Sequence, residues 1–176
     1  MSSSYRYIDP EFSYTDPDTN LLRNLQGITD ADVLLFVESS AVTKRLQELY
    51  EYPLIVKGVI TLFEIHQHLF QDVYSWAGKK RTVEISKEGK QFFPTSFFNN
   101  AFQYIDHVNY LHPFREGNGR SQREFLRLLA FEKGYLLNLN PPDNKGVYDR
   151  YMLGTIESEV KILADLIDEL LILSGE

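Results

Sequence analysis

The stretch from Leu111 to Phe125, LHPFREGNGRSQREF, constrains the fold of this chain more than any other. Pro113 disfavours helical geometry at the residue before it, so a helix arriving from the N-terminal side must end at His112. The Gly-Asn-Gly run at 117–119 then provides a backbone that can turn its N–H groups toward one point. From Arg120 the pattern is helical, and unpaired amides at a helix N-terminus favour negative charge. The stretch therefore predicts an anion-binding loop.

Side chains of complementary chemistry flank this loop. Arg120 and Arg123 are three residues apart on the first helical turn, so both can donate to phosphate oxygens. Glu116 would be repelled by phosphates without a cation between them, and Mg²⁺ prefers one or two carboxylates completed by phosphate and water. His112 has the side chain best suited to accept a proton near neutral pH. Together these residues predict transfer of part of a nucleotide to a hydroxyl group.

Each residue also has an ordinary structural explanation. His112 could be a buried histidine before a proline, and a Gly-Asn-Gly run is often only a turn. Arg120, Arg123 and Glu124 could form a solvated first helical turn. Because all the residue types occur together at the required spacing, we favour the functional interpretation.

The pattern HPFREGNGRSQR resembles the signature of the Fic family, in which HPF, two residues, GNGR, two residues and R are fixed. Every fixed position matches. The resemblance implies a mostly α fold, a Fic-type helical bundle with one short β-hairpin flap. It also implies protein adenylylation, in which AMP from ATP, with Mg²⁺, is attached to a Ser, Thr or Tyr hydroxyl of a target protein.

The resemblance implies a role for each residue of the active-site loop and helix start, residues 112–123. In chain order these are His112 as general base, Phe114 as buried anchor, Glu116 as metal-binding acid, Gly117, Asn118 and Gly119 as the anion hole, and Arg120 and Arg123 as phosphate clamps. The related Doc group carries Lys at the position of Gly119 and transfers phosphate, so glycine favours AMP transfer. A phosphotransferase, or another nucleotidyl- or phospho-group transferase on the same scaffold, is the alternative.

Composition bounds the class of protein. The 176 residues, 43% hydrophobic and 24% charged, suit a single domain over residues 1–176. Zero cysteines exclude disulfides and thiolate metal sites and fit a reducing cytoplasm. A net charge of −7 argues against a direct nucleic-acid partner. Because we find neither a signal peptide nor a membrane-spanning segment, we expect a cytoplasmic protein, with secretion as an effector the alternative.

The first half of the chain predicts an irregular arm and two helices. Residues 1–28 are rich in Asp, Pro and Tyr, with turns at Asp9-Pro10 and Asp16-Pro17. Asp30 caps a helix that runs to about Tyr50. The residues expected on its core side are Leu35, Val42, Leu46 and Leu49.

The second predicted helix covers residues 61–78. Thr61 and Glu64 form a capping box at its start, and Gly78 ends it. His66 lies between apolar neighbours and is expected to be a packed structural residue. His66 and His68 are two residues apart, so they point to different faces and cannot share a metal.

Residues 79–93 break the helical period and predict a short β-hairpin. Val83 and Ile85 alternate with polar residues, and Glu88-Gly89 fits a tight turn. The segment resembles the Fic flap, which pins the target's modifiable segment by strand addition and would place Lys87, Glu88 and Gly89 at the docking edge. A solvated hairpin without a partner is the alternative.

Helical patterns follow on both sides of the motif. Residues 97–111 predict a helix that leads directly into His112, over a span shorter than the family resemblance implies. After the loop, a helix ends at Gly134, a further helix capped by Asp143 runs through Tyr151, and a last helix follows. The apolar faces expected on the first and last of these helices are Phe125, Leu128, Leu129 and Phe131, and Val160, Leu163, Ile167 and Leu170.

Regulation and target are addressed only by resemblance. Many Fic proteins carry an inhibitory helix with Ser or Thr, three residues, Glu, then Gly or Asn; its Glu pairs with the arginine that corresponds to Arg123. The nearest match, Thr155 to Glu159, is followed by Val160 and fails at the last position. We therefore expect a toxin-like enzyme restrained by a separate antitoxin protein. Expected targets are type II topoisomerase subunits such as DNA gyrase or, for a host-directed effector, small GTPases; a catalytically idle peptide-binding module is a further alternative.

Overall fold

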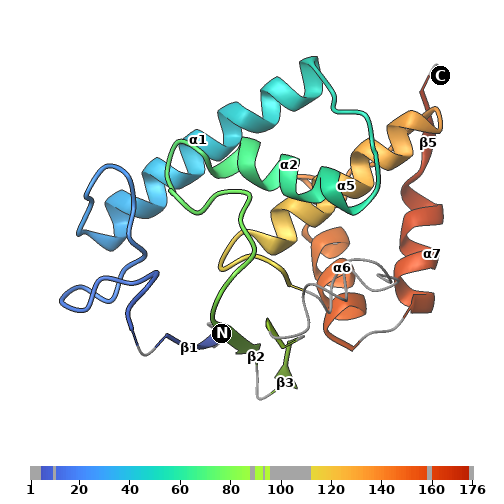
Figure 1. Cartoon of the computed structure of the whole chain (residues 1–176). Coiled ribbons are helices and arrows are strands. Elements are labelled where there is room, and N and C mark those ends of the chain that lie inside the picture. Colours follow the sequence, from blue (N-terminus) through green and yellow to red (C-terminus); the bar gives the residue numbers. More distant parts are fainter. Residues whose placement is uncertain are drawn as a thin grey trace. The chain divides into compact units, whose positions relative to one another are not determined.

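The computed structural model describes residues 5–9, 11–87, 90–92, 94–95, 112–157 and 160–174 (Figure 1). The chain forms two compact units, Met1–Ser121 and Gln122–Glu176, which are described separately below. The predicted mostly helical fold with a short hairpin is confirmed. Within the described ranges, no helix combines the length and apolar character that crossing a membrane requires.

Helix α1 (Ala31–Glu51) begins where Asp30 was expected to cap it, because the Asp30 carboxylate accepts the Val33 N–H at 3.0 Å. Its buried positions are Leu34, Glu38, Val42 and Leu49. The predicted inward position of Leu35 is wrong, since 63% of this residue is exposed. The buried stripe includes a carboxylate at position 38, which an analysis of apolar spacing alone could not place.

Helix α2 (Val59–Phe70) packs beside α1 and differs from its prediction at both ends (Figure 1). Its N-cap is Gly58, with φ of +93°, so the predicted capping box is wrong. The Thr61 hydroxyl instead accepts the Lys57 N–H at 2.8 Å, from the loop that enters the helix. The helix ends at Phe70, and the residues from there to Gly78 form turns. Val73 and Trp76 are buried within these turns, so their side chains reach the core without helical geometry.

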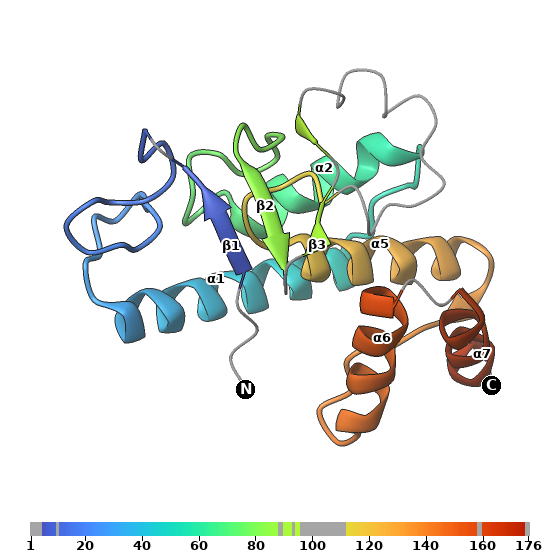
Figure 2. The ribbon, with the colours of Figure 1, turned by 90° about the horizontal axis from the view of Figure 1, so that it is seen from below.

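The flap is a three-stranded antiparallel sheet in the order β1-β2-β3 (Figure 2). Strands β2 (Glu84–Lys87) and β3 (Lys90–Gln91) form the predicted hairpin, with Ser86 opposite Gln91. The prediction of an irregular arm is wrong for β1 (Tyr5–Ile8), which pairs with the other edge of β2. Glu88, Gly89, the Lys87 side chain and the predicted helix at 97–111 lie outside the described residues.

The predicted turn at Asp16-Pro17 is present, whereas Pro10 of the other predicted turn lies outside the described residues. The Asp9 carboxylate accepts the N–H groups of Ser13 and Tyr14 at 2.8 and 2.9 Å. The Asp16 carboxylate accepts the N–H groups of Asp18 and Thr19 at 3.1 and 3.0 Å. Each aspartate therefore caps a short turn through its own side chain.

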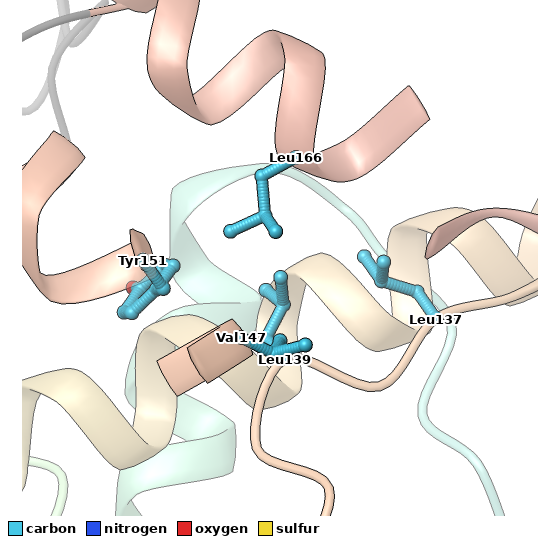
Figure 3. Packing of buried hydrophobic residues seen from close by; sticks show 5 residues of the cluster. All are labelled: Leu137, Leu139, Val147, Tyr151 and Leu166. Carbon is cyan, nitrogen blue, oxygen red and sulfur yellow. The ribbon is translucent and has the colours of Figure 1, made fainter. Parts of the chain in front are cut away.

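The second unit comprises most of α5 (Asn118–Glu132), which begins in the first unit, followed by β4 (Tyr135–Leu136), α6 (Lys145–Glu157), α7 (Val160–Leu170) and β5 (Ile172–Leu173). Figure 3 shows Leu166 of α7 facing Val147 of α6 inside a cluster that also contains Leu137, Leu139 and Tyr151. The last helix is confirmed, and its Leu163, Ile167 and Leu170 pack against this cluster. Helix α6 ends at Glu157 rather than Tyr151.

The predicted apolar face of α5 is only partly correct. Leu128 is fully buried, whereas Leu129 and Phe131 are 38% and 44% exposed. Strand β4 pairs with β5, a contact between Tyr135 and Leu173 that links segments far apart in the sequence. A two-residue strand offers too little pattern to be recognised from sequence.

Candidate active site

The predicted anion-binding loop is closed on itself by Asn118, the first residue of α5. The Asn118 side chain accepts the Phe114 N–H at 3.0 Å and donates to the Phe114 carbonyl at 2.8 Å. This pairing fixes the backbone between His112 and the helix. Because the Asn118 amide is engaged with Phe114, the backbone N–H groups of the first helical turn are the donors that suit an anion.

Gly117 occupies a position where no side chain fits. Its φ is +77°, and a Cβ built there would lie 2.3 Å from the Phe70 ring. The loop therefore lies directly against α2, which carries Phe70. The sequence predicted a glycine here for close approach of a ligand; the structure adds close approach of an aromatic ring.

Phe114, the expected buried anchor, is fully buried. Its ring stacks on His66 at 3.7 Å with 17° between the planes and meets Phe63 edge-on at 5.0 Å. This arrangement seats the motif loop on one face of α2.

His66 links this packing to Glu116. Its Nδ1 accepts the Gly78 N–H at 2.8 Å, which places the ring hydrogen on Nε2, and Nε2 donates to the Glu116 carbonyl at 3.0 Å. Burial lowers the pKa of His66 to about 3, so the ring is neutral. The predicted structural role is confirmed, but sequence reasoning missed the contact with the motif. The position of His66 on the apolar face of a helix was the one sequence signal that could have indicated this contact.

His112, the expected base, leads the loop. It is 7% exposed, and its φ of +37° lies in the left-handed region that non-glycine residues rarely adopt. Its ring stacks on Phe92 at 3.8 Å, and its carbonyl accepts a hydrogen bond from Arg81 Nε at 2.8 Å. Neither neighbour was predicted as a site residue.

Arg120 is held by a buried acidic residue. Its guanidinium donates to the Glu38 carboxylate at 2.6 Å and lies over the Phe70 ring at 4.6 Å. Glu38 also accepts a hydrogen bond from the Tyr74 hydroxyl. Burial, together with the Glu38 carboxylate, raises the pKa of Tyr74, so its hydroxyl remains a donor. Glu38 and Tyr74 were missed because the sequence shows no spacing that links α1 to the motif.

Arg123 lies three residues beyond Arg120 on α5. Its guanidinium is 5.3 Å from the Tyr148 ring centroid and 5.7 Å from that of Tyr151, both on α6. Arg123 is therefore packed within the second unit. Convergence of the two arginines on one phosphate group stays a prediction.

Glu116 is the candidate metal ligand. Its side chain is 39% exposed, and Oε1 accepts the Gly117 N–H at 2.9 Å. Across the described parts of the chain, no three histidine or acidic side chains gather closely enough to form a metal site of their own. A half-exposed carboxylate beside anion-binding amides, with the Arg120 guanidinium 3.8 Å away, fits Mg²⁺, which binds one or two carboxylates together with substrate phosphates.

Comparison with known proteins places this geometry in a family. The family model described as Fic/DOC family matches residues 88–130, a range that includes the whole loop. Protein adenylyltransferase VbhT of Bartonella schoenbuchensis is 38% identical over 69% of this chain, and the match spans 31% of VbhT. A probable protein adenylyltransferase Fic of Salmonella typhimurium is 31% identical over 71% of this chain and 75% of that protein.

A solved structure supports the fold. The BepC effector of Bartonella tribocorum, crystallised with AMPPNP, superposes with a TM-score of 0.77 at 20% identity, covering 93% of this chain and 98% of BepC. This match extends over both compact units, beyond the segment that the family model covers. The Salmonella relative, 31% identical and covered over 75% of its length, shows that the chain belongs to the Fic/DOC family.

Proposed function

We propose that this protein transfers AMP from ATP to a hydroxyl side chain of a target protein. The observation that carries the proposal is the loop that begins at His112 and ends in the N-terminus of α5, with Glu116 and Arg120 beside it. A base, an acidic residue and an anion-binding helix start are the groups that nucleotide transfer needs. Relatives named as protein adenylyltransferases support the same activity.

In the proposed reaction, His112 takes the proton of the target hydroxyl. The hydroxyl oxygen then bonds to the α-phosphorus of ATP, and the bond from that phosphorus to the oxygen bridging to the β-phosphorus breaks, releasing pyrophosphate. The first-turn amides of α5 and the Arg120 guanidinium hold the phosphate oxygens, while Glu116 would hold Mg²⁺. Bound Mg²⁺ would neutralise phosphate charge.

The identity of the transferred group is tested with labelled ATP. A lysate incubated with the purified chain should show a protein band, absent without the chain, that is labelled from the α-phosphate of ATP and not from the γ-phosphate. A band labelled only from the γ-phosphate would instead identify a phosphotransferase. Mass spectrometry of the band then identifies the target and the modified residue.

We propose that the flap presents the target segment. Lys87, Glu88 and Gly89 were expected at the docking edge, but Lys87 belongs to β2, which is already paired on both sides. A target strand would therefore add to β3 or to β1 rather than to β2. Proline substitution at Gln91, on β3, should reduce labelling of the target without reducing ATP binding if the β3 edge is used.

We also propose that a separate antitoxin protein restrains the activity in the cytoplasm. The segment Thr155 to Glu159 lacks the Gly or Asn that completes the inhibitory pattern, and Glu159 lies outside the described residues. Replacing Glu159 by Gly should therefore leave self-labelling of the purified chain unchanged. An increase in self-labelling would instead show that the inhibition is internal.

A further inference from the structure

Arg81 is the most deeply buried cation among the described residues, with 1% of its surface exposed. Its Nε donates to the His112 carbonyl at 2.8 Å, and its backbone N–H donates to the Pro113 carbonyl at 2.6 Å. The guanidinium also donates to the Val83 carbonyl at 2.6 Å and lies 3.5 Å from the Glu84 carboxylate. One residue therefore joins the start of β2 to the two residues that open the motif.

This contact holds a backbone that would not be stable alone. His112 has a left-handed φ of +37°, and such positions persist only where surrounding contacts determine them. Two hydrogen bonds from Arg81 fix the carbonyls of His112 and Pro113, one of them charge-assisted. The direction in which the His112 side chain leaves the backbone thus depends on Arg81.

Phe92 acts on the ring of the same histidine. The two rings stack at 3.8 Å with 20° between their planes. Phe92 directly follows β3, and its N–H donates to the Ile85 carbonyl of β2 at 3.1 Å. The ring orientation of His112 is therefore set by the residue that directly follows β3.

We propose that Arg81 and Phe92 are positioning residues for His112, which they tie to β2 and β3 so that the flap holds the base as well as the target segment. The role rests on the proposed AMP transfer. A hydroxyl presented on the flap would then lie in a fixed relation to the imidazole that takes its proton. Displacement of a catalytic group by about 1 Å can lower a rate by roughly a hundredfold.

The test compares Arg81→Met, Arg81→Lys and Phe92→Leu with the matched control Arg45→Met. Arg45 belongs to the same unit, but its guanidinium pairs with Asp72 and Glu48. In the full chain we measure kcat for AMP transfer at saturating ATP, the Kd for ATP by calorimetry, and the melting temperature. Histidine-labelled NMR spectra follow the His112 ring protons, assigned with His112→Ala.

The proposal expects kcat of Arg81→Met to fall by up to about a hundredfold while the Kd for ATP is unchanged. Arg81→Lys should lie between this variant and the wild type, because one charged donor is retained. Phe92→Leu should lower kcat and shift the His112 ring protons, since the ring current of the stacked phenyl group is lost. Arg45→Met should change neither kcat nor these resonances.

An unchanged kcat in the Arg81 variants and Phe92→Leu would overturn the proposal, as would equal losses of kcat and ATP affinity. If Arg81→Met does not fold, the kcat values of Arg81→Lys and Phe92→Leu decide whether the positioning role holds. If the wild type transfers no AMP, the proposed function fails, and the NMR comparison still tests the positioning. If the His112 resonances do not shift in Phe92→Leu, the positioning role is rejected.

Discussion

The Glu38 carboxylate on α1 accepts a 2.6 Å hydrogen bond from the Arg120 guanidinium at the start of α5. Tyr74 donates to the same carboxylate from the turns that follow α2. The arginine expected to hold phosphate is thus oriented by an acid from the first helix of the chain. The orientation of the Arg120 guanidinium is therefore fixed by contacts within the protein.

Glu38→Gln should lower the free energy of unfolding by about 1–3 kcal/mol, because the neutral amide no longer supplies the negative charge that pairs with the Arg120 guanidinium in a partly buried site. The matched control is Glu48→Gln on the same helix, which removes a more exposed ion pair with Arg45 and should lower the free energy of unfolding by clearly less than Glu38→Gln. Urea denaturation measures both. If both substitutions lower the free energy of unfolding equally, the Glu38–Arg120 pair contributes no more to stability than the Glu48–Arg45 pair.

Gly117→Ala should destabilise the protein, since the left-handed φ costs about 1–2 kcal/mol and the new Cβ must displace the Phe70 ring. The variant Gly27→Ala measures the cost of the left-handed φ alone. Gly27 has a φ of +67°, and nothing lies within 4 Å of a Cβ placed there. Thermal unfolding should therefore rank Gly117→Ala well below Gly27→Ala, and the reverse order would contradict the close packing of the loop on α2.

His66 predicts a pH dependence of stability. Its pKa falls from 6.5 to about 3 on folding, so between these values the unfolded chain binds a proton that the native state does not. The stability from neutral His66 is complete above pH 6.5 and falls with decreasing pH, by up to about 1.4 kcal/mol per pH unit. Urea denaturation between pH 5 and pH 7 checks the slope.

The matched variants for this slope lie two residues apart on α2. His66→Gln should flatten the pH dependence, because the titrating ring is gone. His68→Gln, at a position about a quarter exposed beside Glu48, is the comparison variant that removes a histidine outside the buried site. If the free energy of unfolding of His66→Gln depends on pH as steeply as that of the wild type, the proton is taken up by a group other than His66.

Local signals made the motif loop predictable. Pro113, the glycines and the helical pattern after Arg120 define a loop and a helix start within a few residues, and α5 does begin at Asn118. The Asp30 cap was predictable for the same reason. Such features depend on neighbours in sequence, which is the information that spacing contains.

Contacts between distant segments were not predictable in this way. Strand β1 exists because Tyr7 pairs with Ile85, a partner that no spacing in residues 1–28 could indicate. The capping box at Thr61 failed because Gly58 supplies the turn and the Thr61 hydroxyl binds the preceding loop. Glu38 and Arg81 carry charge and would be placed on the surface by composition, yet their partners lie within the motif.

The central claim is that His112 deprotonates a hydroxyl that then takes AMP. Its most direct measurement is intact-protein mass spectrometry of an identified target after incubation with ATP and either the wild type or His112→Ala. We expect a mass gain of one AMP group with the wild type, formed about 10²–10⁴-fold more slowly with His112→Ala, which still binds ATP. The same rate of AMP addition by both proteins would contradict it.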